Sequence, residues 1–434
     1  MVRKKEMKII GYSALLLISS SVVGLLLLCL VYMLPTEPMK ERVKYAYDLF
    51  MDERVSHDWA NAVEFTRLDG YTDMIMYGTA IYDGEEGVLT EALLNRRMDK
   101  RGEERMDLAD YISGQPGTYE PQSYERYWHG YLIWLKPLLL VMHPRNIRVF
   151  NMILQIFVLA YFLQLLAVKF NRNYFIPFIA GIIIINPVST AMCLQYSSIY
   201  YISLIAMILA LKSPQLLQKK TGFSLFFLGI GICVAYFDFL TYPPVALCLP
   251  LFVYLCLRSS DENTDYEQTK VVSVFRAGIY WSVGYVGMWG FKWVLPLLVG
   301  VNQFAELFYE IGFRTDLGSK SLVGLLIEKI RVIAIKPFIF FFMFVIAYML
   351  ITAIRSIKKG KICFVAPDLL ISYILVGLIP FGWYFGARQH SGHTFAYRDI
   401  VGTIMSILFI IEEFTLVNQR KCGRAEECRI ANRG

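Results

Sequence analysis

Residues 9–34 read IIGYSALLLISSSVVGLLLLCLVYML, an apolar run without a single charged side chain. A helix needs about 20 apolar residues to cross the hydrocarbon core of a bilayer, and this run is long enough. The basic residues before it, among them Lys4 and Lys5, give the charge order of a signal peptide. The run is too long for the apolar part of a signal peptide, and no small-residue cleavage site of the usual kind follows it. We therefore predict an uncleaved first transmembrane helix with a cytoplasmic N-terminus.

The composition of the whole chain agrees with this start. Hydrophobic residues make up 56% of the 434 residues and charged residues only 18%, whereas about a quarter of a soluble domain is charged. The net charge of +7 does not indicate nucleic acid binding, because the basic residues fall mainly in short loops between apolar runs, as in membrane proteins. None of the eight cysteines lies in the long polar segment, so no disulfide framework is expected there.

Further apolar runs of roughly 20 residues predict an all-α polytopic membrane protein with about ten transmembrane helices. After the first helix, the expected spans are 149–168, 174–190, 194–211, 222–238, 245–257, 276–300, 334–354, 366–386 and 399–417. The expected regions are 1–34, the basic N-terminus and first helix; 35–148, a large extracytoplasmic loop; 149–417, a multi-helix membrane domain; and 418–434, a basic cytoplasmic tail.

Loop charges predict the orientation of the chain. The segments 212–220, 258–270, 355–361 and the tail are basic or lie at basic helix ends, which favours the cytoplasm. Alternate counting then places 35–148, 238–244, 301–333 and 388–398 outside, and both termini inside. All five histidines are then predicted on the outer side. The predicted location of the protein is a cell membrane, of the bacterial plasma-membrane kind.

The polar segment from Pro35 to Arg148 is expected to contain short interfacial elements. Apolar residues at helical spacing predict an amphipathic helix over 40–55, and 84–115 has the charge pattern of a solvated excursion. Tyr131 to Met142 is apolar over only about 12 residues, which suits an interfacial or re-entrant element better than a span.

Within this segment, Asp69 and Asp73 belong to the sequence RLDGYTD at residues 67–73. Residues four apart share one face of a helix. A carboxylate pair there can hold a divalent cation, or supply a base that deprotonates an acceptor hydroxyl. The alternative is a solvated loop in which these are two of many acids.

A second stretch, YERYWHG at residues 124–130, contains Trp128 and His129. Aromatic faces with a few polar groups can hold a sugar ring or an isoprenoid chain near its headgroup. They are equally typical of the aromatic belt at a membrane interface.

The third stretch, RQHSGHTFAYR at residues 388–398, carries Arg388, His390, His393 and Arg398. Arginine forks match phosphate geometry, so this loop is a candidate clamp for a phosphate or diphosphate headgroup. The two histidines have a metal-like spacing, but two ligands are too few for a zinc site. The alternative is a hydrated loop between two spans.

Ionisable residues near the hydrocarbon are costly and are usually paired or functional. Asp238 is expected at the outer end of its helix, within reach of the same site, and Lys292 in the outer half of its span could neutralise an acid or a phosphate. Glu412 and Glu413 are expected near the cytoplasmic interface. Within 301–333, apolar residues at helical spacing predict an amphipathic helix lying on the outer surface.

No phosphate-binding glycine loop, serine-hydrolase elbow or zinc-protease motif is present, which disfavours an ATP-driven pump and a membrane protease. The layout of one helix, a large outer loop with acids, several spans and a second amphipathic outer loop at 301–333 resembles the GT-C superfamily of integral membrane glycosyltransferases. The resemblance covers the topology of nearly the whole chain. The superfamily often has a pair of adjacent acids soon after the first helix. This chain departs from that pattern, because its acids there, Asp48, Asp52 and Asp58, are not adjacent.

The resemblance implies transfer of a sugar from a polyprenyl-phosphate-linked donor to a cell-envelope glycan, lipid or polymer, as in polysaccharide biosynthesis. Asp69 or Asp73 would be the base or the partner of a Mg²⁺ or Mn²⁺ ion, and Arg388, Arg398, His390 and His393 would stabilise the leaving phosphate. The expected partners are the bilayer, the lipid-linked sugar and the acceptor. Two other functions fit the sequence: a transporter or flippase of lipid-linked saccharides, and a non-catalytic membrane protein of envelope assembly.

Overall fold

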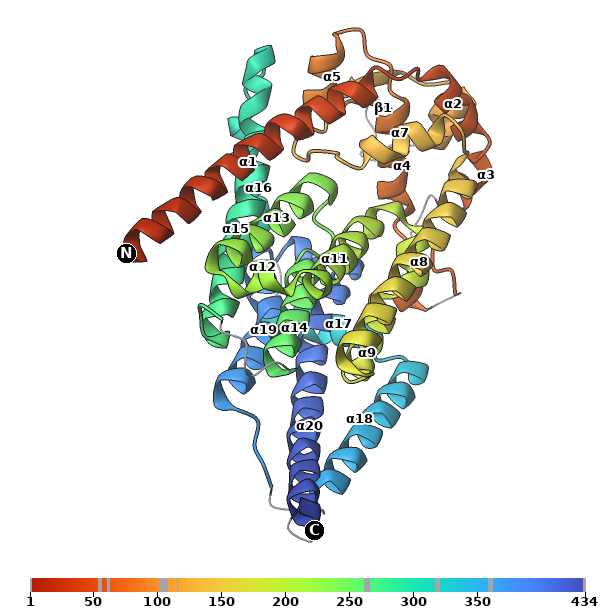
Figure 1. The fold of residues 1–434 in the computed structure, drawn as a ribbon. Helices are drawn as coiled ribbons and strands as arrows, with labels where there is room; N and C mark the ends of the chain where they lie inside the picture. The colour runs from red at the N-terminus through yellow and green to blue at the C-terminus, as the bar shows by residue number, and fades with distance from the viewer. Residues whose placement is uncertain are drawn as a thin grey trace.

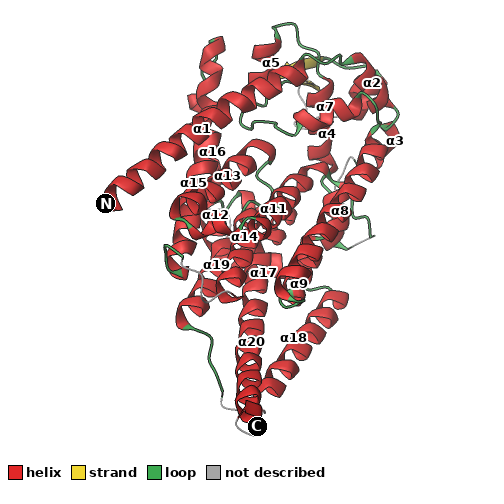
Figure 2. Ribbon diagram, in the orientation of Figure 1, coloured by secondary structure: helices red, strands yellow, loops and turns green. Residues whose placement is uncertain are grey.

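The structure is a computed structural model that describes residues 2–53, 57–60, 63–100, 108–114, 116–260, 266–316, 321–357 and 362–431. The side chains of Val2, Arg3, His390 and residues 420–431 lie outside the described part. The fold is helical apart from the antiparallel pair β1 (Arg97–Lys100) and β2 (Tyr119–Gln122), drawn in yellow beside α5 in Figure 2.

The helices around the polar segment are α1 (Val2–Tyr32), α2 (Glu37–Lys44), α3 (Tyr47–Asp52), α4 (Gly70–Ile81), α5 (Val88–Leu94), α6 (Leu108–Ser113) and α7 (Leu132–Leu139). The remainder are α8 (Pro144–Phe170), α9 (Phe175–Ile185), α10 (Pro187–Met192), α11 (Leu194–Lys212), α12 (Pro214–Gln218), α13 (Lys220–Phe237), α14 (Pro244–Ser260), α15 (Lys270–Val294), α16 (Phe304–Thr315), α17 (Leu322–Ile333), α18 (Lys336–Ile357), α19 (Pro367–Gly386) and α20 (Val401–Ala431). Short 3₁₀ turns form η1 (Glu64–Thr66), η2 (Leu295–Val299), η3 (His390–Gly392) and η4 (Thr394–Ile400).

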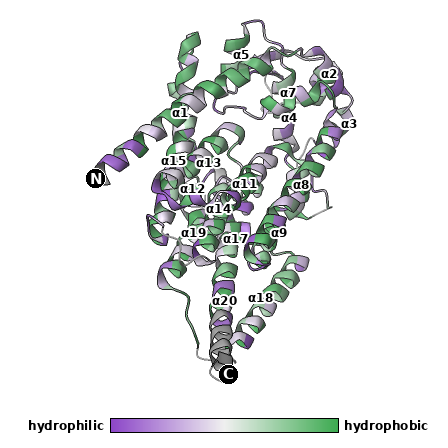
Figure 3. Ribbon diagram, in the orientation of Figure 1, coloured by the Kyte–Doolittle hydropathy of each residue, from purple (hydrophilic) through white to green (hydrophobic). Residues whose placement is uncertain are grey.

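Eight helices in the described part of the chain are long and apolar enough to cross a membrane. They are α1, α8, α11, α13, α15 with η2, α18, α19, and α20 with η4. The chain is therefore a multi-pass membrane protein by helix length and hydropathy. Figure 3 shows green along the middle of α1 and purple at its N-terminal end.

The sequence expectation of about ten spans included α9 and α14, which have only 11 and 17 residues. At a rise of about 1.5 Å per residue, α9 covers roughly half of a bilayer core. It ends because Asn186 adopts a left-handed conformation with φ 62° and Pro187 begins the next helix. Proline cannot continue the helix that precedes it. Asn186 caps α10 instead, since its side chain accepts a hydrogen bond from the Ser189 amide at 3.2 Å.

The polar segment folds into a layer of short helices, α2 to α7, at the top of Figure 1 around the end of α1. The predicted helix over 40–55 is two helices, α2 and α3, which bury Val43 and Phe50 against this layer. The described part of 84–115 is more ordered than a solvated excursion, because α5 buries Leu93 and Leu94. With 8 residues, α7 is too short to span, as predicted.

A close contact fixes α1 against α13. Tyr236 donates a hydrogen bond to the Gly24 carbonyl at 2.6 Å. A Cβ atom on residue 24 would stand 2.6 Å from the tyrosine ring, so only glycine allows this approach.

At each end of the helix bundle, segments that the charge pattern predicts on the same side of the membrane are in contact. At the end near the start of α1, the basic end, Lys5 pairs with Glu267 at 2.6 Å and Glu6 with Arg276 at 2.9 Å. At the opposite end, the loop end, the Gly130 amide donates to the Tyr236 carbonyl and Arg126 pairs with Glu310. Segments predicted to share a side therefore do meet, while which end faces the cytoplasm stays a prediction.

Candidate functional site: the start of helix α11

The two predicted acids lie at the first turn of α4. Asp69 is the N-cap, and its carboxylate accepts hydrogen bonds from the Thr72 amide at 3.1 Å and the Thr72 hydroxyl at 3.0 Å. Such capping satisfies amides that have no partner within the helix. Asp69 is half-buried, whereas Asp73 is only 1% exposed. The pair thus shares one helix end, but only Asp69 remains near the surface.

Asp73 is held by the start of α11 and by an arginine. Its carboxylate accepts hydrogen bonds from the amides of Leu194 and Gln195 at 3.2 and 3.3 Å, and lies 3.5 Å from the Cys193 sulfur. Arg148 donates to it at 3.2 Å. Burial raises the pKa of Asp73 to about 6, although Arg148 acts in the opposite direction. An anion at a helix N-terminus is favourable, so Asp73 ties α4 to α11.

Arg148 binds a second acid in the same place. Its guanidinium donates to both oxygens of Glu53, at 2.7 and 2.6 Å, in the two-pronged geometry typical of arginine and carboxylate. Arg148, Glu53 and Cys193 were not among the residues predicted from the sequence. Arg148 was the last residue of the polar segment, and an arginine at the start of an apolar run was the one signal that could have identified it.

Arg398 lies on the other side of the start of α11 and is fully buried. Its Nε donates to the Ile185 carbonyl at 2.9 Å and its Nη1 to the Phe395 carbonyl at 3.4 Å. The guanidinium lies over the rings of Tyr196, Tyr397 and Tyr242, at 4.1, 4.7 and 5.5 Å. Its Nη2 has no hydrogen-bond partner among the described residues.

The polar segment 35–148 and the loop 388–398 are in contact near the start of α11. Tyr196 belongs to the first turn of α11, and its amide donates to the Cys193 carbonyl at 3.1 Å. The Tyr397 hydroxyl lies 3.5 Å from the Phe65 carbonyl, and the rings of these two residues are 5.3 Å apart. Arg398 and the acids at 69 and 73 therefore flank the same helix start, although they are over 300 positions apart in the chain.

The remaining residues of the 388–398 loop are placed differently. The Arg388 guanidinium lies 5.6 Å from the Phe385 ring, and the next amide, that of Gln389, donates to the Arg314 carbonyl at 3.4 Å. His393 is exposed, with its ring stacked on Phe395. The His390 side chain lies outside the described part of the structure.

Trp128 and Lys292 form a separate buried cluster. The Trp128 indole donates to the Met288 carbonyl at 2.6 Å. The Lys292 ammonium donates to the Leu93 carbonyl at 2.6 Å and to Asn95 at 2.5 Å. These bonds tie the end of α5 to α15, which is the role expected of a structural brace.

His129 and Asp238 are also bonded within the protein. The His129 ring contacts the Tyr131 hydroxyl at 2.9 Å and the Tyr124 carbonyl at 2.7 Å, and burial lowers its pKa well below the usual value. Asp238 accepts a hydrogen bond from the Thr241 amide at 2.7 Å, in a tight turn after α13. Burial raises the pKa of Asp238 to about 7.

No group of three or more His, Cys, Asp or Glu side chains that could hold a metal ion occurs within the described ranges. The metal-binding role of Asp69 and Asp73 stays a prediction.

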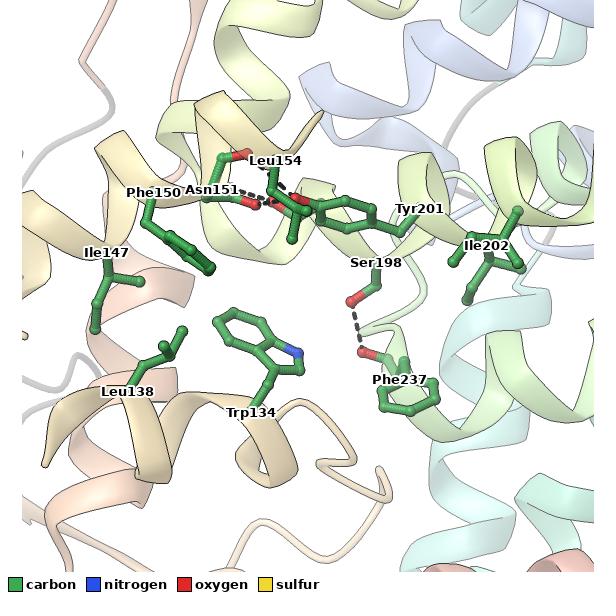
Figure 4. Close-up of a pocket in the computed structure, with 12 residues that line it drawn as sticks. Trp134, Leu138, Ile147, Phe150, Asn151, Leu154, Ser198, Tyr201, Ile202 and Phe237 are labelled. Atoms are coloured by element: carbon green, nitrogen blue, oxygen red, sulfur yellow. Dashed lines mark hydrogen bonds between the residues drawn. The ribbon is translucent and has the colours of Figure 1, made fainter. Parts of the chain in front are cut away.

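A groove of about 330 Å³ lies beside the start of α11 (Figure 4). It is lined by Trp134 and Leu138 of α7, by α8, by α11 and by Phe237, and Phe150, Leu154 and Ile205 at its sides are exposed on the outer surface of the helices. Its polar part is a network in which Asn151 donates to Ser197 at 2.8 Å and accepts from Tyr201 at 2.9 Å. Ile147, another lining residue, precedes Arg148.

The chain matches no protein-family model, and no curated protein or solved structure matches it.

Proposed function

We propose that this multi-pass membrane protein is a glycosyltransferase that uses a polyprenyl-phosphate-linked sugar. The observation that supports the proposal is that Asp69 and Arg398 each lie beside the start of α11. The Asp69 carbonyl is 3.6 Å from the Cys193 sulfur, and the Arg398 guanidinium is 4.1 Å from the Tyr196 ring. Asp69 is an acid near the surface, and Arg398 has a donor atom without a partner among the described residues. A base and a fixed cation on one helix start are what transfer from a lipid phosphate requires.

In the proposed reaction, the Asp69 carboxylate takes the proton of an acceptor hydroxyl. The hydroxyl oxygen then forms a bond to the anomeric carbon of the donor sugar. The bond from that carbon to the phosphate oxygen breaks, and the electron pair leaves with the polyprenyl phosphate. Arg398 stabilises the charge that develops on this phosphate. Asp73 is a positioning residue, because its carboxylate fastens α4, and with it Asp69, to α11.

The groove between α7, α8 and α11 supports a donor that carries a long hydrocarbon chain. Its walls are apolar and continue into the lipid-facing surface of α8, of which Phe150 and Leu154 are part. Ile147, which lines the groove, is followed in α8 by Arg148, which donates a hydrogen bond to Asp73. A chain in the groove would bring its phosphate toward the acids and Arg398, with the hydrocarbon kept out of water.

The test is transfer by purified protein in lipid nanodiscs supplied with polyprenyl-phosphate sugars and an acceptor. The readout is release of free polyprenyl phosphate. Asp69→Asn should lower the rate about 100-fold or more, as loss of a general base does. Asp58→Asn is the matched control. Asp58 pairs at 3.1 Å with Arg67, which lies close to Asp69 in the sequence. Loss of the Asp58 carboxylate should leave the rate within about twofold. An Asp69→Asn protein with full transfer would refute the proposal.

A transporter of lipid-linked saccharides is the second candidate, because the apolar groove would equally hold the hydrocarbon chain of a lipid that is moved rather than used as a donor. A transporter would move labelled lipid across the vesicle membrane without releasing lipid phosphate. The same preparation therefore distinguishes the two functions. Absence of both activities with all donors would leave the envelope-assembly function.

A further inference from the structure

Two acids of one predicted span are fully buried but differ in their partners. Glu413 accepts hydrogen bonds from the hydroxyls of Ser259, Tyr174 and Tyr373, at 2.6, 2.9 and 3.1 Å. Asp399 lies in η4, before the start of α20, and neither of its carboxylate oxygens has a hydrogen-bond partner among the described residues. From the sequence, Glu413 is expected near the cytoplasmic interface, and Asp399 is the first residue of the predicted span 399–417.

The charged groups around Asp399 come from three elements. Lys329 approaches from α17, Asp238 from the turn after α13, and Arg398 from the preceding position in η4. Lys329 donates to the His393 carbonyl at 2.7 Å and to Glu328 at 3.1 Å. Arg398 donates to the carbonyls of Ile185 and Phe395.

The other titratable neighbours, Cys248 of α14 and Tyr384 of α19, direct their hydrogens away from Asp399 as well. Tyr384 donates to the Ala396 carbonyl at 2.8 Å, and the Cys248 sulfur lies 3.8 Å from the Val376 carbonyl.

An ionised carboxylate is costly to bury unless hydrogen bonds or a bonded cation compensate for lost water. Glu413 has such compensation in three hydroxyl donors. Asp399 has no bonded donor among the described residues, and one of its three charged neighbours is another acid. The neutral acid avoids most of this cost.

We propose that Asp399 is a proton-binding site, occupied by a proton in the closed structure and sealed from water by α17. The proposal does not depend on sugar transfer. Helix α17 packs against η4, η1 and α19. Its buried residues are Leu325, Lys329 and Val332. Exchange of the proton with water then requires α17 to move away, which would also break the bond from Lys329 to His393.

The test uses N,N′-dicyclohexylcarbodiimide, an apolar reagent that adds to protonated carboxyl groups in apolar surroundings. The acid oxygen bonds to the carbodiimide carbon, and the acid proton passes to one of its nitrogens. Wild-type protein in nanodiscs is labelled at several pH values, digested, and mapped by mass spectrometry. We expect label at Asp399, decreasing as the pH rises, and no label at Glu413.

Variants assign the site by a second readout, the infrared carbonyl stretch of protonated carboxyl groups. Asp399→Asn should remove one such band at neutral pH, whereas Glu413→Gln should leave all of them. Label at Glu413 but not Asp399, label independent of pH, or an unchanged band in Asp399→Asn would each overturn the proposal. Because the mapping is done on the wild-type protein, it does not depend on folding of either variant.

Discussion

Two buried arginines, Arg148 and Arg398, flank the start of α11 in different surroundings. Both act electrostatically on Cys193, the residue that precedes this helix. Arg148 forms ion pairs with Glu53 and Asp73. Arg398 contacts two backbone carbonyls and three tyrosine rings, with no ion pair among the described residues. The difference indicates that Arg148 stabilises the fold through ion pairs, whereas the Arg398 Nη2 has no hydrogen-bond partner among the described residues.

The largest effect on stability is expected from Arg148→Met. The substitution leaves Glu53 and Asp73 buried without their cation, which should lower the free energy of unfolding by about 3–5 kcal/mol. Thermal unfolding in detergent, followed by circular dichroism, measures this. Arg145→Met is the matched control, because Arg145 is exposed on the same helix and its loss should change stability by no more than about 0.5 kcal/mol. Equal stabilities of the two variants would contradict the structural role of Arg148.

For Arg398 we expect the opposite pattern. Arg398→Lys keeps the charge but loses the planar fork, and transfer should fall about 100-fold if Arg398 stabilises the leaving phosphate. Stability should fall by only about 1 kcal/mol, chiefly through the lost bond to the Ile185 carbonyl. The assay is release of polyprenyl phosphate in nanodiscs, with unfolding measured on the same sample.

Arg388→Lys serves as the control for this experiment. Arg388 lies beside Phe385, at the end of α19, rather than among the tyrosines, so its substitution should leave the rate nearly unchanged. A larger loss of activity from Arg388→Lys than from Arg398→Lys would move the phosphate site to the other end of the loop.

The sequence predicted local features well and long-range partners poorly. Apolar length identified α1. The four-residue spacing predicted Asp69 and Asp73 on one face of a helix, and the structure has them at the N-cap and in the first turn of α4. The apolar run 174–190 predicted one continuous span, but Asn186 and Pro187 end α9 within it. Lys292 was expected to face a phosphate or an acid, but it bonds to Asn95, 197 positions away. Arg148 and Glu53 are 95 positions apart, and nothing in a single sequence pairs one acid among many with one arginine.

The smallest effect on stability is expected from Asp73→Asn. This variant tests whether Asp73, which is bonded to Arg148, titrates near neutral pH in the folded protein. The pKa of Asp73 is about 6 in the folded protein, raised by burial above its usual 3.8. The folded state therefore binds a proton that the unfolded state has lost, and this contribution to stability decreases as the pH rises from about 4 through 6. Between pH 5 and pH 7 the wild-type protein should lose about 1 kcal/mol that the asparagine variant does not lose. Unfolding of both proteins across this range measures the difference; parallel curves would mean that Asp73 stays ionised throughout, and that Arg148 and the start of α11 outweigh its burial.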